Sequence, residues 1–326
     1  MAFLHVPRPW QLPESQATSE AAFYNRRRFL KTLAGASLAG AALPLLGCQK
    51  QLTADDSPLV GTRPLSVERN PVFAQVERET TNELLAATYN NYYEFGSSKA
   101  IWRNAQALPT EDWKVEVTGL VNQPRTYDLD DLTRAFPLEE RLYRFRCVEA
   151  WAMVVPWVGF PMNALIQAVE PTSKAKFVRF TSYFDRAVTK GPTFPPSQFL
   201  PFPYTEGLRI EEMANDLAFF AVGIYGHTLP KQHGAPIRAV IPWKYGFKGA
   251  KSIVKIEFTE TQPATFWNTL SPNEYKFEAN VEPDVPHPRW SQAKERLIGP
   301  GSQFDWQEVP TIKYNGYGEF VASLYA

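Results

Sequence analysis

The chain has 326 residues, with 34 lysines and arginines against 34 aspartates and glutamates, so its formal net charge is +0 at pH 7. A neutral chain of this length can bury a sizeable core, and its charge balance gives no indication of a nucleic-acid partner. Aromatic residues make up 14% of the chain and prolines number 28, which favours short strands joined by loops over a helical bundle.

An export signal is predicted over residues 1–47. The string Asn-Arg-Arg-Arg-Phe-Leu-Lys at 25–31 precedes a mildly apolar run, and this pattern resembles a twin-arginine signal peptide. The apolar run from 33 to 46 is shorter than the roughly 20 residues that a membrane-spanning helix needs. Proteins that use this route are exported already folded, typically because a cofactor is inserted in the cytoplasm. We therefore expect a periplasmic protein with a cofactor.

The end of the signal allows two interpretations. Leu-Leu-Gly-Cys at 45–48 resembles a lipobox, in which Cys48 would carry a lipid and anchor the protein without a spanning helix. Small residues before an ordinary cleavage site fit the same string. Both alternatives stay open.

A polar, proline-interrupted linker is predicted over 48–72, followed by a single domain over 73–326. The first elements of this domain are a short helix over 82–87, an aromatic and Asn-rich structured loop over 89–96, and a strand over 113–117. A helix over 129–136 follows, with Asp128 as its N-cap, and it ends before Pro137.

The rest of the chain predicts more strands than helices. One helix is expected over 161–169, with Pro161 in its first turn, and a loop rich in Pro and Phe over 191–207. Further strands are predicted at 141–148, 177–183, 217–225, 237–242 and 252–260. The tail from 262 onward is expected to wrap around the body. Without strict alternation of strands and helices, the pattern favours an α+β domain with mixed, mostly antiparallel sheets.

Several kinds of site are excluded by missing motifs. The sequence contains no His-Glu-x-x-His or Cys-x-x-Cys pair for a metal held by protein ligands alone. It also lacks the glycine-rich dinucleotide and Walker loops and the Gly-x-Ser-x-Gly elbow of hydrolases.

Cys147 is the first candidate for chemistry, since it is the single thiol of the domain if Cys48 belongs to the signal. Arg144 and Arg146 precede it, and nearby cations favour the thiolate form that binds metals. A soft thiolate at a strand end suits a metal whose other ligands come from a cofactor. The alternative is a buried, inert cysteine that packs as a small hydrophobic side chain.

A second candidate is the segment 232–252, where glycines and lysines alternate after His233 and Arg238. Such a loop can present backbone N–H groups and cations to a phosphate. A solvated basic turn would show the same spacing.

Together these strings resemble the sulfite-oxidase superfamily. They are Arg-Phe-Arg-Cys-Val-Glu-Ala-Trp at 144–151, His-Gly-x-Pro-x-Arg at 233–238, and Trp-Lys-Tyr-Gly-Phe-Lys-Gly at 243–249 with Lys251 and Ser252. Within it the chain resembles the family of periplasmic protein-methionine-sulfoxide reductase catalytic subunits, through the strings at 89–96, 136–141 and 287–292. The likeness extends from about Tyr89 to Tyr325.

The resemblance implies a sulfite-oxidase-type molybdopterin-binding fold and a Mo-molybdopterin cofactor. Cys147 would be the protein ligand of the metal, and Asn91 and Glu149 would flank its open side. The pterin and its phosphate would be held by Asn90, Tyr93, Glu94, Ser182, His233, Arg238, Gly249, Ala250 and Lys251. His233 and Ser182 stand where a close relative has Asn and Thr, and both can still form hydrogen bonds.

The implied activity is reduction of methionine sulfoxide in oxidised periplasmic proteins. Electrons would come from a membrane-embedded haem-binding subunit, because this chain has no ligand set for haem or iron–sulfur clusters. Glu149 would deliver protons, tuned by burial beside Arg146, or would be only a charge partner of an arginine. Trp290 would help to shape a shallow site for side chains on a protein surface.

Two alternatives remain at this point. One is an oxidase or dehydrogenase acting on sulfite, or a reductase of small S- or N-oxides, of the same fold. For sulfite, the cationic pocket would be supplied by Arg144, Arg146 and Arg179. The other is a lipid-anchored binding module in which Cys147 is inert.

Overall fold

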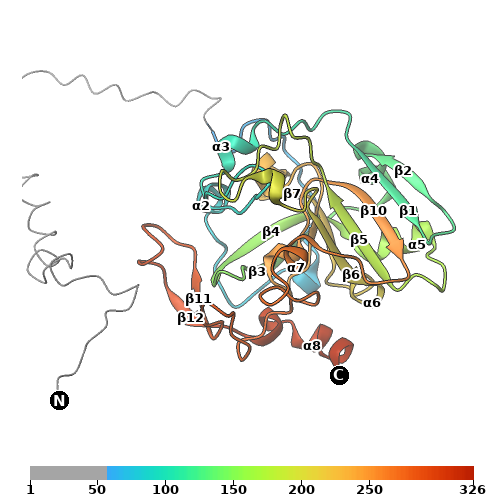
Figure 1. Cartoon of the computed structure of the whole chain (residues 1–326). Helices are drawn as coiled ribbons and strands as arrows, with labels where there is room; N and C mark the ends of the chain where they lie inside the picture. The colour runs from blue at the N-terminus through green and yellow to red at the C-terminus, as the bar shows by residue number, and fades with distance from the viewer. Residues whose placement is uncertain (1–56) are drawn as a thin grey trace, which may run out of the picture. The chain divides into compact units, whose positions relative to one another are not determined.

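The computed structural model describes residues 57–326 (Figure 1). The predicted signal peptide, Cys48 and the first part of the predicted linker lie outside the described residues. In the part that is described, no helix is both long enough and apolar enough to cross a membrane.

One of two sheets has five strands in the order β2-β1-β10-β5-β6. Their bounds are Arg125–Asp128 (β2), Lys114–Gly119 (β1), Ile253–Thr259 (β10), Phe177–Ser182 (β5) and Thr205–Arg209 (β6). β1 and β10 are parallel, and the other neighbours are antiparallel. In β1 and β5 buried residues alternate with more exposed ones, which is the pattern of a sheet with one face on the core.

The second sheet has seven strands and contains the site described below. The path β12-β11-β4-β7-β8 is joined by β3, which pairs with β4, and by β9, which pairs with β7. The bounds are Glu139–Arg146 (β3), Trp151–Pro161 (β4), Phe219–Ile224 (β7), His227–Thr228 (β8), Arg238–Val240 (β9), Lys294–Leu297 (β11) and Glu308–Pro310 (β12). β3 and β4 are antiparallel and pair from Glu139 opposite Gly159 to Arg146 opposite Ala152. β11 runs parallel to β4.

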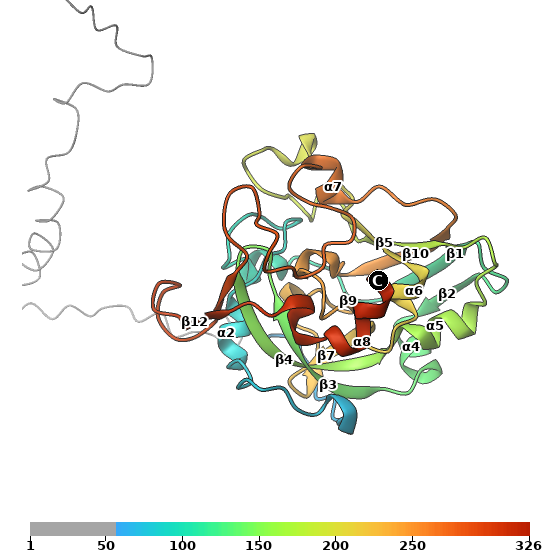
Figure 2. The same cartoon turned by 90° about the horizontal axis from the view of Figure 1, so that it is seen from below.

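The helices are short and lie around the sheets (Figures 1 and 2). The α-helices are α2 (Glu83–Thr88), α3 (Trp102–Ala105), α4 (Leu129–Ala135), α5 (Met162–Val169), α6 (Ile210–Met213), α7 (Phe266–Leu270) and α8 (Gly318–Val321). The 3-10 helices are η4 (Pro71–Phe73), η5 (Ser197–Phe199), η6 (Lys231–His233), η7 (Gly246–Lys248), η8 (Lys313–Gly316) and η9 (Ala322–Tyr325). α4 begins as predicted, because the Asp128 carboxylate accepts a hydrogen bond from the Asp131 amide at 2.6 Å.

The main hydrophobic core joins the two sheets. Phe180 of β5 and Phe220 of β7 meet edge to face, with ring centroids 5.9 Å apart, and Phe160 of β4 lies 5.6 Å from Phe220. All three side chains are 0% exposed. Aromatic residues thus supply much of the buried apolar area, as the composition indicates.

The α+β prediction is confirmed, but the structure corrects several elements. The strand predicted to end at the cysteine ends at Arg146 instead. β4, the longest strand, is absent from the predictions because ten of its eleven positions are buried and the sequence therefore shows no alternation. β6 overlaps the end of the predicted 191–207 loop, and β11 and β12 lie in the predicted tail.

The segment from residue 57 to 72 is hydrogen-bonded along the domain, although the sequence predicts a linker there. The Leu65 amide donates to the Gly226 carbonyl at 2.8 Å, and the Asn70 amide donates to the Glu140 carbonyl at 2.8 Å. Leu65 also packs against the core. Backbone pairing of this kind depends little on side-chain type, so the polar sequence gives no sign of it.

Candidate active site

A four-residue turn, Cys147–Ala150, joins β3 to β4 and carries the candidate metal ligand. The Cys147 amide donates to the Trp151 carbonyl at 2.9 Å, and the Ala150 amide donates to the Cys147 carbonyl at 3.0 Å. Ala150 takes a left-handed backbone conformation with φ of 65°, which non-glycine residues rarely adopt. The long β3–β4 pairing thus holds this turn in a fixed conformation at its end.

The turn opens into a pocket with about 1090 Å³ of empty space, including its open mouth. Most of the predicted site residues line it: Asn90, Asn91, Tyr93, Glu94, Cys147, Glu149, His233, Arg238, Gly249 and Lys251. Ser182 and Ala250 do not line the pocket. Ser182 lies at the end of β5, where its amide donates to the carbonyl of the pocket residue Tyr204 at 2.9 Å. Ala250 is buried between the two lining residues Gly249 and Lys251.

Cys147 is buried, with 4% of its surface exposed. Burial, reinforced by the negative charge of Glu149, raises the pKa of its thiol to about 12. The charge of Arg146 acts to lower the pKa, as predicted, but burial outweighs it, so the predicted shift toward the thiolate is wrong for the protein alone. The thiol is therefore protonated unless a metal displaces the proton.

Both arginines face away from the pocket because side chains alternate along β3. Phe145 and Cys147 line the pocket, so Arg144 and Arg146 point to the opposite face. The Arg146 side chain is fully buried and bonds the Glu295 carboxylate at 2.8 Å.

Arg144 and Arg179, which were also named for a sulfite site, form ion pairs away from the pocket. Arg144 lies 3.5 Å from the Glu77 carboxylate, and Arg179 pairs with Glu257 on the neighbouring strand of the five-stranded sheet. None of the three arginines lines the pocket. The sulfite alternative, in which these three arginines would supply a cationic pocket, therefore has no support from their positions.

Glu149 lines the pocket at its mouth, because its side chain is 40% exposed, and its ion-pair partner is Lys99 and not Arg146. Its carboxylate also accepts hydrogen bonds from Asn91 Nδ2 at 2.9 Å and from Trp151 Nε1 at 3.1 Å. Burial acts to raise the pKa of Glu149, but Lys99 and these hydrogen bonds outweigh it, and the pKa is lowered. Glu149 is therefore ionised at neutral pH. This corrects the expectation that burial beside Arg146 tunes it.

Lys99 is the functional candidate that the sequence analysis missed. Its ammonium donates to Glu149 and to the Asn91 side-chain oxygen. Asn91 Nδ2 in turn lies 3.6 Å from Cys147 Sγ. The only signal in the sequence is the position of Lys99 shortly after the 89–96 string. Tyr204, Trp267 and Tyr275, which also line the pocket, were not predicted either.

Arg238 provides a buried positive charge in the pocket. It is 4% exposed, and its guanidinium donates to the His233 carbonyl at 3.0 Å and the Ala239 carbonyl at 3.3 Å. Burial lowers the pKa of Arg238 to about 10. Within residues 57–326 no carboxylate forms an ion pair with it; the charges that act on its pKa belong to Tyr92 and Tyr204.

The charge of Arg238 acts on two further buried residues of the pocket, Lys251 and His233. Burial and the charge of Arg238 lower the pKa of Lys251, whose ammonium donates to the Asn91 carbonyl. His233 is buried, and burial together with Arg238 and Lys251 lowers its pKa well below 6.5, so the imidazole is neutral. A buried guanidinium without a carboxylate is costly unless an anion joins it.

These features fit a polar heterocycle with a phosphate group. A Cβ atom at Gly249 would lie 2.9 Å from Arg238 Nη2, so glycine keeps space beside the guanidinium. Among the described residues, the buried Oδ1 of Asn90 and the buried Oγ of Ser182 have no hydrogen-bond partner. Of these two residues Asn90 lines the pocket, so a polar ligand bound there would satisfy its Oδ1.

Trp290 supports the turn and does not line the pocket. Its Nε1 donates to the Val148 carbonyl at 2.8 Å, and its ring stacks on His287 with centroids 3.8 Å apart. The side-chain Nε2 of Gln292 donates to the same carbonyl at 2.8 Å. The prediction that Trp290 shapes the open site is thus not supported by its position.

Comparison with known proteins adds three findings. The family model described as oxidoreductase molybdopterin binding domain matches residues 103–267. The chain is 48% identical to the protein-methionine-sulfoxide reductase catalytic subunit MsrP of Burkholderia mallei over 315 residues, which cover 96% of this chain and 93% of that protein. Among solved structures it is similar to the sulfane dehydrogenase SoxCD from Paracoccus pantotrophus, with 15% identity, a TM-score of 0.48, and coverage of 92% of this chain and 70% of the other.

Proposed function

Because the chain belongs to the molybdopterin-binding oxidoreductases and, within them, to the protein-methionine-sulfoxide reductase catalytic subunits, we propose that it reduces methionine sulfoxide residues in exported proteins. The single observation that carries this proposal is the content of one pocket. It combines the soft sulfur of Cys147 with the buried cation Arg238, which has no carboxylate partner in residues 57–326. A metal and a phosphate are the two groups that such side chains accept.

Cys147 would bind the metal, and Arg238 with the Gly249–Lys251 turn would bind the phosphate of the cofactor. Asn90, Tyr93, Glu94 and His233 would contact the pterin, and Ser182 and Ala250 remain predicted contacts next to the lining residues. A molybdenum cofactor held by these residues would supply two-electron redox chemistry and oxygen-atom transfer. The overall reaction consumes two electrons and two protons and yields the thioether and water.

The residues at the mouth would orient the substrate and move protons. Glu149 is ionised and 40% exposed in its side chain, so it can take protons from solvent and pass them inward but does not store one at neutral pH. Lys99 neutralises Glu149 and can donate a hydrogen bond to a sulfoxide oxygen. Trp267 and Tyr275 supply apolar surface on which a methionine side chain can pack.

The partner and the location belong to the same proposal. The relative is named a catalytic subunit, which implies a second subunit; we propose a membrane-embedded haem-binding electron donor. The twin-arginine string at 25–31 supports export to the periplasm. If the string at 45–48 is a lipobox, Cys48 would carry a lipid anchor there.

The test is the molybdenum content of protein purified from the periplasm, with Cys147→Ser as the variant. We expect one molybdenum per chain in the parent, reduction of protein-bound methionine sulfoxide, and loss of both in the variant. Protein without molybdenum, from a host that makes the cofactor, would refute the proposal and favour a binding module. Faster turnover of sulfite, or of small S- or N-oxides only, would favour those alternatives.

A further inference from the structure

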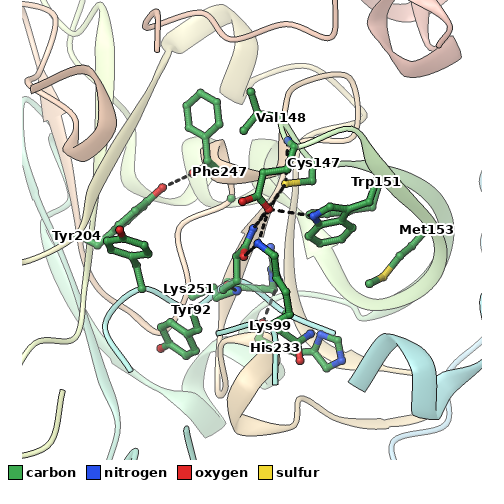
Figure 3. A pocket seen from close by; sticks show the side chains of 18 of the residues that line it. Tyr92, Lys99, Cys147, Val148, Trp151, Met153, Tyr204, His233, Phe247 and Lys251 are labelled. Atoms are coloured by element: carbon green, nitrogen blue, oxygen red, sulfur yellow. Dashed lines mark hydrogen bonds and ion pairs between the residues drawn. The ribbon is translucent and has the colours of Figure 1, made fainter. Parts of the chain in front are cut away.

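The side chain of Asn91 is held from three sides at the pocket mouth. Lys99 Nζ donates to its Oδ1, while its Nδ2 lies 2.9 Å from a Glu149 carboxylate oxygen and 3.6 Å from Cys147 Sγ. The last distance is that of an N–H···S hydrogen bond. Figure 3 shows Lys99 and Cys147 on the two sides of this group of contacts.

The neighbours leave only one orientation for the Asn91 amide. An ammonium can only donate hydrogen bonds, and an ionised carboxylate can only accept them. Oδ1 must therefore face Lys99, and Nδ2 must face Glu149. The second hydrogen of Nδ2 is then available to the Cys147 sulfur.

Lys99 is the residue that fixes both contacts of this amide. It bonds Asn91 directly, and it also binds the Glu149 carboxylate, whose side chain is 40% exposed. Without Lys99, the Glu149 carboxylate would keep the hydrogen bonds from Trp151 and Asn91 but lose its only ion pair among the described residues, and Asn91 Oδ1 would lose the donor that fixes it. Glu149 alone therefore does not secure the orientation.

We propose that Lys99 is a positioning residue, which orients the Asn91 amide so that its N–H donates to the Cys147 sulfur and tunes the reduction potential of the metal. Hydrogen bonds to a metal-bound sulfur withdraw electron density from it and favour the reduced metal. Lys99 thereby raises the potential at which the site accepts electrons. This inference rests on the proposed binding of molybdenum by Cys147.

The experiment is a redox titration of the holoenzyme, in which EPR follows the one-electron molybdenum couple, after the metal content has been measured. Lys99→Met removes the donor, whereas Lys99→Arg keeps a side chain that can only donate. We expect Lys99→Met to keep its molybdenum and to shift the couple negatively by about 59 mV, a tenfold change in a one-electron equilibrium. Lys99→Arg should remain close to the parent.

Loss of a nearby positive charge could also lower the potential, so the same change is made in an Asn91→Leu background. A charge acts through space and would give the same shift there, whereas an effect through the amide would largely vanish. Equal shifts in both backgrounds, or no shift with Lys99→Met, would overturn the inference while leaving the proposed function intact. So would loss of metal in both Lys99→Met and Lys99→Gln, because Lys99 would then have a structural role. A parent without molybdenum would overturn both.

Discussion

Replacing Arg238 with methionine should leave the cofactor-free protein at least as stable as the parent, although the side chain is buried. Burial lowers the pKa of Arg238 from 12.5 to about 10, which at 1.36 kcal/mol per pKa unit corresponds to a cost of ~3 kcal/mol for the charged form. The substitution removes this cost. It also removes two hydrogen bonds to backbone carbonyls, each worth about 1 kcal/mol. We therefore expect between no change and a gain of about 1 kcal/mol.

Arg146→Met is the matched control, because Arg146 is equally buried but is paired with Glu295. Breaking a buried pair leaves an uncompensated charge and costs about 3 kcal/mol. Both variants would be produced without cofactor and unfolded in urea, with tryptophan fluorescence as the signal. With cofactor available, Arg238→Met should purify with less molybdenum than the parent. A loss of stability in cofactor-free Arg238→Met as large as that in Arg146→Met would refute the view that the buried charge of Arg238 is uncompensated until an anion binds.

Three further outcomes are expected. The buried His233 is neutral, and its pKa lies well below the unfolded value of 6.5. The free energy of unfolding should therefore fall below pH 6.5, by up to about 1.36 kcal/mol per pH unit. In urea titrations at several pH values, His233→Asn should reduce this slope, and an unchanged slope would contradict the assignment. Gly246→Ala would place a Cβ atom 2.2 Å from the Phe145 ring, which lines the pocket, so molybdenum content should fall; full occupancy would show that the ring can move. Trp290→Phe removes the hydrogen bond to Val148 and should cost about 1 kcal/mol in thermal unfolding, without changing the ratio of rates on free and protein-bound methionine sulfoxide; a selective loss on the protein substrate would place Trp290 at the substrate.

Local signals in the sequence predict local structure well. The N-cap at Asp128 and the helix of 161–169 are confirmed because capping and helical periodicity depend on neighbouring residues. β4 is not predicted because a strand buried on both faces has no alternating pattern. β11 pairs with β4 through its backbone, and the sequence does not record which strand it joins.

The same distinction applies to the site. Cys147, Glu149 and Asn91 are predicted as neighbours through the family resemblance, and the structure brings them together. The arginines beside Cys147 were misinterpreted because residues adjacent in a strand point to opposite faces. Lys99 contacts Glu149 across 50 residues of sequence, and no spacing rule predicts such a contact.

The parallel pairing of β11 with β4 has a consequence for when the pocket can form. The Arg296 amide donates to the Ala150 carbonyl of the cysteine turn at 2.9 Å, and Glu295 binds the buried Arg146 one residue before Cys147. These contacts link positions 146 and 149 residues apart in sequence. During synthesis, β11 must therefore leave the ribosome before the cysteine turn has its full support. A product truncated before β11 would lack these contacts to the cysteine turn and to Arg146.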